Sequence, residues 1–134
     1  MTIKVISAKQ FATKLKATIQ ASGRLGFTDE TAKELDLASG KFAKFAKDDE
    51  KGTLYLIIID EENEEAFPVK LSSSYFYVPA RLMFDMLGFD YTNNNIMFDL
   101  IRQSSLDNDL NGQVYMMKPR VNKRKEKKTE EMIV

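Results

Sequence analysis

The side chains best suited to chemistry in this sequence are cations gathered near its C-terminus. Seven basic residues and three acidic ones follow Met117. The seven are Lys118, Arg120, Lys123, Arg124, Lys125, Lys127 and Lys128. Clustered cations neutralise phosphates and release counterions, which gives a salt-dependent affinity for nucleic acid. The same charges could instead bind an acidic protein surface or only keep the chain in solution.

Four basic residues in the body of the chain are candidates for additional contacts: Arg24, Lys41, Lys70 and Arg81. Arg24 lies in the segment 23–26, whose G-x-x-G form is used by KH domains to hold a single-stranded backbone. The favoured interpretation of that segment is a plain hairpin turn, because glycine readily adopts the positive φ that such turns need.

Aromatic residues offer a second kind of contact in the segment Tyr75-Phe76-Tyr77. In a strand, Phe76 points to one face and the two tyrosines point to the other. If Phe76 is in the core, the tyrosines form a platform for bases or for a protein partner. The favoured alternative is the reverse arrangement, with the tyrosines half-buried under a helix.

No segment has the complete spacing of a metal site. Residues 107–112 match the first six positions of a calcium-binding loop, D-x-D-x-N-G, but position 12 is Lys118 instead of a carboxylate. We therefore expect a turn between strands there. The acidic run 60–65 has no identifiable partner ligand, so we expect a solvated loop, no metal and no cofactor.

Catalysis finds little support in the composition. The chain has no Cys and no His, which removes disulfides, thiolate nucleophiles and the commonest general base. It also lacks a P-loop, a G-x-S-x-G motif and a dinucleotide fingerprint. We expect a binding module that is not an enzyme.

Length and charge distribution predict one folded domain with a tail. A chain of 134 residues, 43% of them hydrophobic, is long enough to bury a core. Up to Met117 there are 13 basic and 17 acidic residues, so an acidic body precedes the basic C-terminal segment. We predict a single domain at 1–117 and a flexible, basic tail at 118–134.

Hydropathy predicts a soluble, cytoplasmic protein without a membrane partner. The longest apolar run, Leu54–Ile59, is far too short to span a bilayer, and the apolar stretch in 1–6 is too short for a signal peptide. The absence of Cys fits a reducing compartment.

The elements that must position these residues are short. Strands are expected at 2–6, 17–21, 54–59, 67–71, 75–78, 96–101 and 113–117. Helices are expected from Ser7 to about Lys16, from a Thr28 cap to Gly40, and from Pro79 to Gly88 with Leu82, Met83, Met86 and Leu87 on its apolar face. The fully apolar run 54–59 should be a central strand buried on both faces, followed by a hairpin through the acidic loop. We predict an α+β fold, a compact β-rich domain of about nine short strands and three short helices.

The arrangement strand, small-residue turn, strand, helix occurs twice. The first copy spans 18–37 with a turn at Ser22-Gly23, and the second spans 68–89 with a turn at Ser72-Ser73. Two similar halves would build a barrel. A chance echo, which any α+β meander can produce, is the alternative.

The two copies resemble the swapped-hairpin barrel half of AbrB-like transition-state regulators and antitoxins. The residues that carry the resemblance are Ser22-Gly23-Arg24-Leu25-Gly26-Phe27 with Leu35-Asp36-Leu37-Ala38-Ser39-Gly40, and Tyr77-Val78-Pro79 with Leu87-Gly88-Phe89. Thr28 departs from the pattern, which has Pro there. In that family, halves from two subunits interlock and bind DNA through basic residues. The resemblance implies a similar barrel, completed within a monomer or by exchange in a homodimer.

Together these features predict a small nucleic-acid-associated regulator that uses its basic C-terminal arm. The alternative is a structural or assembly protein, for example of a phage or mobile element, whose tail docks on a neighbouring subunit. Salt-dependent binding of nucleic acid by the isolated protein would separate the two.

Overall fold

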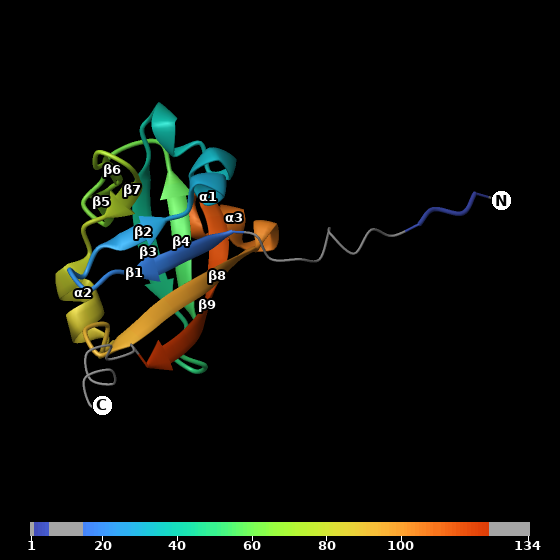
Figure 1. Cartoon of the computed structure of the whole chain (residues 1–134). Helices are drawn as coiled ribbons and strands as arrows, with labels where there is room; N and C mark the ends of the chain where they lie inside the picture. The colour runs from blue at the N-terminus through green and yellow to red at the C-terminus, as the bar shows by residue number, and fades with distance from the viewer. Residues whose placement is uncertain (1, 6–14, 124–134) are drawn as a thin grey trace.

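The computed structural model describes residues 2–5 and 15–123, which form one sheet with short helices (Figure 1). The strands are β1 Lys16–Ile19, β2 Leu25–Phe27, β3 Phe42–Lys47, β4 Leu54–Ile59, β5 Ala66–Pro68, β6 Lys70–Leu71, β7 Phe76–Val78, β8 Asn94–Arg102 and β9 Gln113–Lys123. The α-helices are α1 Asp29–Glu34, α2 Arg81–Met86 and α3 Asp107–Leu110, and 3₁₀ turns lie at Leu37–Ser39 (η2) and Ser104–Leu106 (η3). The predicted β-rich α+β domain is confirmed. Within the described ranges, no helix has the length and apolarity needed to cross a membrane.

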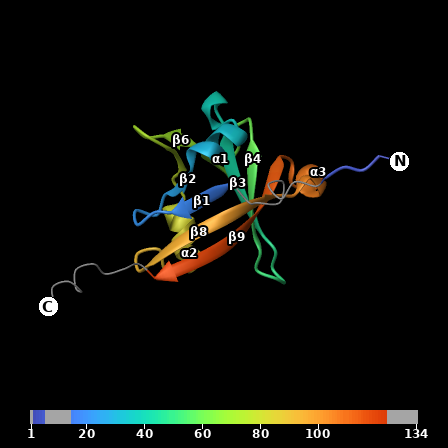
Figure 2. The same ribbon diagram turned by 45° about the vertical axis from the view of Figure 1, so that its right-hand side comes forward.

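The sheet curls into a nearly closed barrel (Figure 2). Its strand order is β5-β3-β4-β9-β8-β1-β2-β7-β6, so β5 and β6 are the two outermost strands. Only Val69 separates these two strands along the chain. Because the two chain steps from Pro68 to Lys70 span at most about 7 Å, the end of β5 and the start of β6 must lie close together. The backbone N–H of Val69 donates to the carbonyl of Lys41 at 3.2 Å and ties this junction to the start of β3.

The two similar halves of the sequence become two hairpins that meet side by side. β1 and β2 form the first hairpin, followed by α1, and β6 and β7 form the second, followed by α2. β2 pairs antiparallel with β7, with Leu25 opposite Val78 and Gly26 opposite Tyr77. Each half therefore contributes its second strand to the junction, and both halves belong to the same chain.

Aromatic rings fill the interior of the barrel. Phe84 of α2 is fully buried, and its ring packs edge-on against Phe45 and Phe89 with centroids 6.2 and 5.8 Å apart. Phe89 packs in the same way against Phe98 of β8 at 5.7 Å. This series of contacts joins α2 to β3 and β8. Figure 1 shows α1 and α2 toward opposite ends of the barrel.

β4 is covered on both faces, as its apolar sequence predicts. It pairs with β3 on one side and β9 on the other. Leu56 and Ile58 belong to the core, whereas Ile57 is buried on the opposite face. A Cβ added to Gly112 would lie only 2.5 Å from Cγ2 of Ile57. The turn between α3 and β9 therefore packs over the outer face of β4.

The prediction of which residues form the apolar face of α2 is wrong in part. Leu82 and Met86 are 77% and 87% exposed, whereas Phe84 is completely buried. The helix begins at Arg81, after Ala80, and has only six residues. A helix of fewer than two turns can bury only one narrow side, and the large ring of Phe84 takes that side.

The N-terminal expectations also differ from the structure. Residues 2–5 form no strand, and the side chains of Ile3 and Val5 are exposed. The helix expected from Ser7 falls outside the described residues except at its end, where Lys16 already begins β1. The alternation of buried and partly exposed residues from Lys16 to Ile19 is therefore strand periodicity, and the strand begins one residue earlier than expected.

The acidic loop does not lead into a hairpin partner of β4. β5 pairs instead with the far edge of β3, with Phe67 opposite Ala43. The end of the expected strand 67–71 belongs to β6, which pairs with β7. The reason is that both edges of β4 are already occupied by β3 and β9.

β9 continues beyond the domain boundary expected after Met117. Residues 118–123 pair with the first part of β8, from Asp99 back to Asn94. These six residues therefore belong to the sheet instead of a flexible tail, because the nine-residue β8 extends along them. Residues 124–134 lie outside the described residues.

Candidate nucleic-acid interface

Strand pairing places a row of side chains across six strands of the barrel. The row runs through Lys70 of β6, Tyr77 of β7, Gly26 of β2, Thr18 of β1, Met97 of β8 and Arg120 of β9. Directly paired residues of antiparallel strands share a face. The neighbouring residues Leu25, Ile19 and Ile96 point the other way and are buried in the core. The row therefore lies on the outside of the barrel. We call the outward surface of β1, β2, β6, β7, β8 and β9 the outer face.

The outer face is rich in positive charge. Lys16 and Lys118 lie beside the row, and Arg24 lies in the turn before β2, so five cationic side chains gather there with Lys70 and Arg120. Among the described residues that β1, β2, β6, β7, β8 and β9 turn outward, Asp99 is the one carboxylate. A phosphate backbone would meet net positive charge here.

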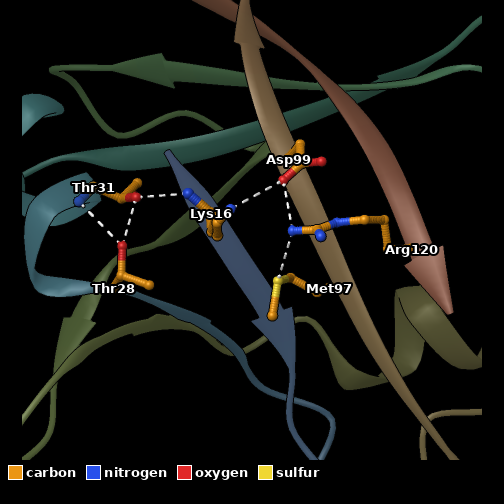
Figure 3. Close-up of polar contacts among 6 residues, drawn as sticks. All are labelled: Lys16, Thr28, Thr31, Met97, Asp99 and Arg120. Carbon is orange, nitrogen blue, oxygen red and sulfur yellow. Dashed lines mark hydrogen bonds and ion pairs between the residues drawn. The ribbon is translucent and has the colours of Figure 1, made fainter. Parts of the chain in front are cut away.

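Asp99 holds two of these cations in place (Figure 3). Its Oδ1 lies 3.5 Å from Nζ of Lys16 and 3.0 Å from Nη2 of Arg120. The same Arg120 nitrogen lies 3.3 Å from Sδ of Met97. The side chain of Asp99 is only 16% exposed, so its contacts connect β1, β8 and β9 at a partly protected position.

The cap of α1 fixes the start of β1 beside Asp99 (Figure 3). Thr28 is the predicted N-cap, and its Oγ1 accepts a hydrogen bond from the backbone N–H of Thr31 at 3.2 Å. The buried hydroxyl of Thr31 accepts from the backbone N–H of Lys16 at 2.7 Å. One short helix therefore determines where the Lys16 side chain leaves the sheet.

A cluster of two tyrosines and one arginine lies on the part of the outer face formed by β7 and the turn before β2. The rings of Tyr75 and Tyr77 have centroids 5.8 Å apart, and Cζ of Arg24 lies 4.2 Å from the centroid of Tyr77. Nη1 of Arg24 donates to the Tyr75 hydroxyl at 3.5 Å, and this hydroxyl donates to Oε1 of Gln20 at 2.9 Å. The hydrogen bond to Tyr75 raises the pKa of Arg24 above its ordinary value.

The placement of this cluster corrects one part of the favoured interpretation of the tyrosines, the face to which they point. Phe76 packs against the core, and Tyr77 lies opposite Gly26 on the outer face. Both tyrosines are half-buried, but their ring and hydrogen-bond partners are each other, Arg24 and Gln20. The structure therefore has the side-chain directions of the platform arrangement, with Phe76 inward and Tyr77 outward, and the partial burial of the favoured alternative.

Two glycines allow this cluster to form. A Cβ on Gly26 would lie 2.5 Å from Nε2 of Gln20 and 3.5 Å from Cδ2 of Tyr75. Gly23 has φ of +90°, and a Cβ there would lie 2.5 Å from Cγ of Arg81. Gly23 and Arg24 therefore belong to the hairpin turn and Leu25 and Gly26 to β2, and the two glycines leave room for neighbouring side chains.

The structure brings together some of the predicted contact residues and separates others. Arg24 and Lys70 share the outer face with Lys118 and Arg120, and Arg81 packs beside the turn at Gly23. Arg81 also pairs with Asp85 at 3.9 Å, and Lys123, at the end of β9, is exposed. Arg124, Lys125, Lys127 and Lys128 lie outside the described residues.

Lys41 is the predicted contact that lies elsewhere. It forms an ion pair with Asp60 and lines an open groove of about 610 Å³ together with Lys44 and the acidic loop 60–65. Sequence reasoning missed Lys16, Thr18 and Met97. The alternation of Lys16 and Thr18 with buried Ala17 and Ile19 was the available signal for two of them.

The segment that resembles a calcium loop has a structural role. Asp107 accepts two hydrogen bonds from Arg102, both at 2.7 Å, and a third from the backbone N–H of Val114 at 3.0 Å. These contacts, led by the one from Arg102, hold the pKa of the Asp107 carboxyl below its ordinary value. Within the described part of the chain, no three acidic side chains are grouped so that they could hold a metal ion.

Comparison of the chain with family models, with curated proteins and with solved structures finds no match. The resemblance to AbrB-like regulators therefore stays a prediction. A functional conclusion has to come from the outer face itself.

Proposed function

We propose that the protein is a non-enzymatic nucleic-acid-binding module, a small regulator that holds phosphates on its outer face. The observation that carries this proposal is the charge of that face, with five cations and one carboxylate among the described residues. Four more cations, Arg124, Lys125, Lys127 and Lys128, follow β9 in the sequence and extend the basic character of its end.

The charge of the outer face contrasts with the rest of the chain. Residues 1–117 carry more acidic than basic groups, so a surface with a single carboxylate represents a clear segregation of charge. Segregated positive charge attracts polyanions and gains free energy from counterion release. Nucleic acid is the polyanion that this arrangement suits best, and an acidic protein surface is the competing ligand.

The cations of the outer face are available for a ligand to different degrees. Lys70 and Lys118 are exposed and form no ion pair within the described residues. Lys16 and Arg120 share the single charge of Asp99, so these three groups together keep one positive charge. Lys70 and Lys118 can therefore each neutralise a phosphate, while Asp99 fixes the positions of Lys16 and Arg120.

A pair of matched double variants tests the proposal. Lys118→Gln with Arg120→Gln removes two charges from the outer face, whereas Lys41→Gln with Lys44→Gln removes two from the groove beside the acidic loop 60–65. Fluorescence anisotropy with an oligonucleotide gives the dissociation constant across a salt series. The first variant should reduce the slope of log K against log salt by about 1.4 to 1.8, and the second should leave it unchanged. No binding at low salt, or equal losses in both variants, would refute the proposal.

Truncation after Lys123 separates the outer face from the residues that follow it. This variant keeps all of β9 but lacks four cations. We expect weaker binding with a smaller salt dependence. Complete loss of binding would assign the site to the segment 124–134 alone.

Assembly through β9 is the second candidate function, because part of its edge is open. The carbonyl of Val114 accepts from the N–H of Gln103 at 2.8 Å, so the backbone groups of Val114 face β8. Because backbone groups alternate in direction along a strand, the backbone groups of Pro119, Val121 and Lys123 point away from β8. β4 covers that side only for residues 113–117.

This open edge is partly protected against a further strand. Pro119 has no N–H to donate, and lysine near a strand edge opposes pairing. Val121, however, is 56% exposed, which a partner strand would bury. Light scattering over a range of concentrations distinguishes the functions, since a stable dimer without nucleic acid would favour assembly.

A further inference from the structure

We infer that the nucleic acid bound by the outer face is single-stranded and that one base stacks on Arg24, above Tyr77. The inference rests on the proposed function and specifies the class of ligand. It comes from the aromatic and guanidinium cluster, which electrostatic attraction alone does not require.

The cluster forms a stack with one open side. The guanidinium of Arg24 lies 4.2 Å above the ring of Tyr77, and Arg24 is exposed. The ring of Tyr77 therefore lies against the guanidinium on one side, and the exposure of Arg24 leaves part of its surface open to solvent. Unpaired bases stack on aromatic rings and on arginine planes because both present flat, polarisable surfaces. A base placed on Arg24 would extend the existing stack by one layer.

Hydrogen bonds hold this stack in a fixed position before a ligand arrives. The Tyr75 hydroxyl accepts from Arg24 and donates to Gln20, so it connects the two side chains. The Gln20 amide lies over Gly26, where a larger residue would displace it. A base on Arg24 would then have an amide nearby that can reach its polar edge.

Phosphate contacts lie along the same face. Tyr77 and Arg120 occupy one row separated by β2, β1 and β8, which corresponds to a distance of at most about 20 Å across the sheet. A strand whose base rests on Arg24 could run along this row toward Arg120 and Lys118. The arrangement therefore combines base stacking at one end with backbone neutralisation at the other.

The described helices are unsuited to reading a duplex. Recognition in the major groove needs an inserted helix or a two-stranded ribbon. α1 and α2 have six residues each and α3 has four, so none is longer than about 9 Å. The ribbon of β8 and β9 carries the cations Lys118 and Arg120 and could enter a groove, and the experiment includes this outcome.

The experiment compares single-stranded DNA, single-stranded RNA and duplex DNA of one sequence, each about 12 nucleotides long. Anisotropy should show tighter binding to both single strands than to the duplex. Tyr77→Leu removes the ring beneath Arg24 and should weaken single-strand binding by about 2- to 5-fold, the loss of one exposed cation–π contact, and Tyr77→Phe should keep normal binding. Arg24→Lys keeps the charge but loses the plane, so it should weaken single-strand binding without changing duplex binding. Tyr55→Leu, on β4, is the aromatic control.

A 2-aminopurine probe reports the stacking directly. Its fluorescence should change on binding to the normal protein and to Tyr77→Phe, and should change less on binding to Arg24→Lys. Melting curves establish that each variant is folded. Equal affinity for duplex and single strands, with no effect of Tyr77→Leu, would overturn the inference and leave the proposed function intact. Absence of binding to all three ligands would refute both.

Discussion

Replacement of Phe84 by Ala tests how α2 closes the barrel. The side chain is fully buried and makes edge-on contacts with Phe45 and Phe89. Truncation of a buried Phe to Ala usually costs about 3 to 5 kcal/mol through lost transfer free energy and a residual cavity. The two ring contacts place Phe84 toward the upper end of that range. This is a large part of the roughly 5 to 15 kcal/mol expected for the whole domain.

Urea unfolding followed by circular dichroism gives the free energy of unfolding of each variant. Phe84→Leu serves where the Ala variant fails to fold, since it leaves a smaller cavity and a smaller loss. Leu82→Ala and Met86→Ala are matched controls on the same helix, and their exposure predicts changes within about 0.5 kcal/mol. If Leu82→Ala destabilises the protein as much as Phe84→Ala, the assigned orientation of α2 is wrong.

Three further outcomes are expected. Truncation after Lys123 should leave the urea midpoint unchanged. Truncation after Met117 should lower the midpoint, because β8 loses its partner along 118–123. Equal midpoints for the two truncations would contradict the extended β9. The pKa of Asp107 is lower in the folded protein than in the unfolded chain, where it is about 4. The ionised Asp107 carboxylate therefore stabilises the fold above about pH 4, and this stabilisation is lost as the pH falls through the folded-state pKa. Asp107→Asn should therefore flatten the acid limb of the stability profile, and an unchanged profile would exclude the Arg102 contact as its cause. Ile57→Ala should cost about 2 to 4 kcal/mol in urea melts although it lies outside the barrel, and a negligible cost would mean that the α3 turn does not cover it.

Local signals in the sequence were sufficient for several elements. Thr28, followed by acidic residues, marks the start of α1, because a hydroxyl cap satisfies a free N–H within the same turn. The uninterrupted apolar run 54–59 predicts a strand covered on both faces, since exposing either face would leave apolar surface in water. Gly52 in the preceding turn has φ of +74°, a value that favours glycine.

The candidate site could be predicted only in parts. Arg24, Lys70 and Arg120 were each identified as cations, but their alignment depends on the order of six strands. Lys41 carried the same signal, yet the fold places it beside Asp60. The charge of a residue is local information, whereas the surface that it joins is decided by pairing between distant segments.

The sequence by itself determined the β-rich character of the domain, the cap at Thr28, the buried run of β4 and the basic end of the chain. Tertiary structure decided which side of α2 is buried, which strand receives β5, and how far β9 continues. These choices depend on non-local contacts, because Phe84 can enter the barrel only once β3 and β8 surround it. Residues 118–123 likewise contain little apolar surface of their own, and they become a strand because β8 offers unpaired backbone groups beside them.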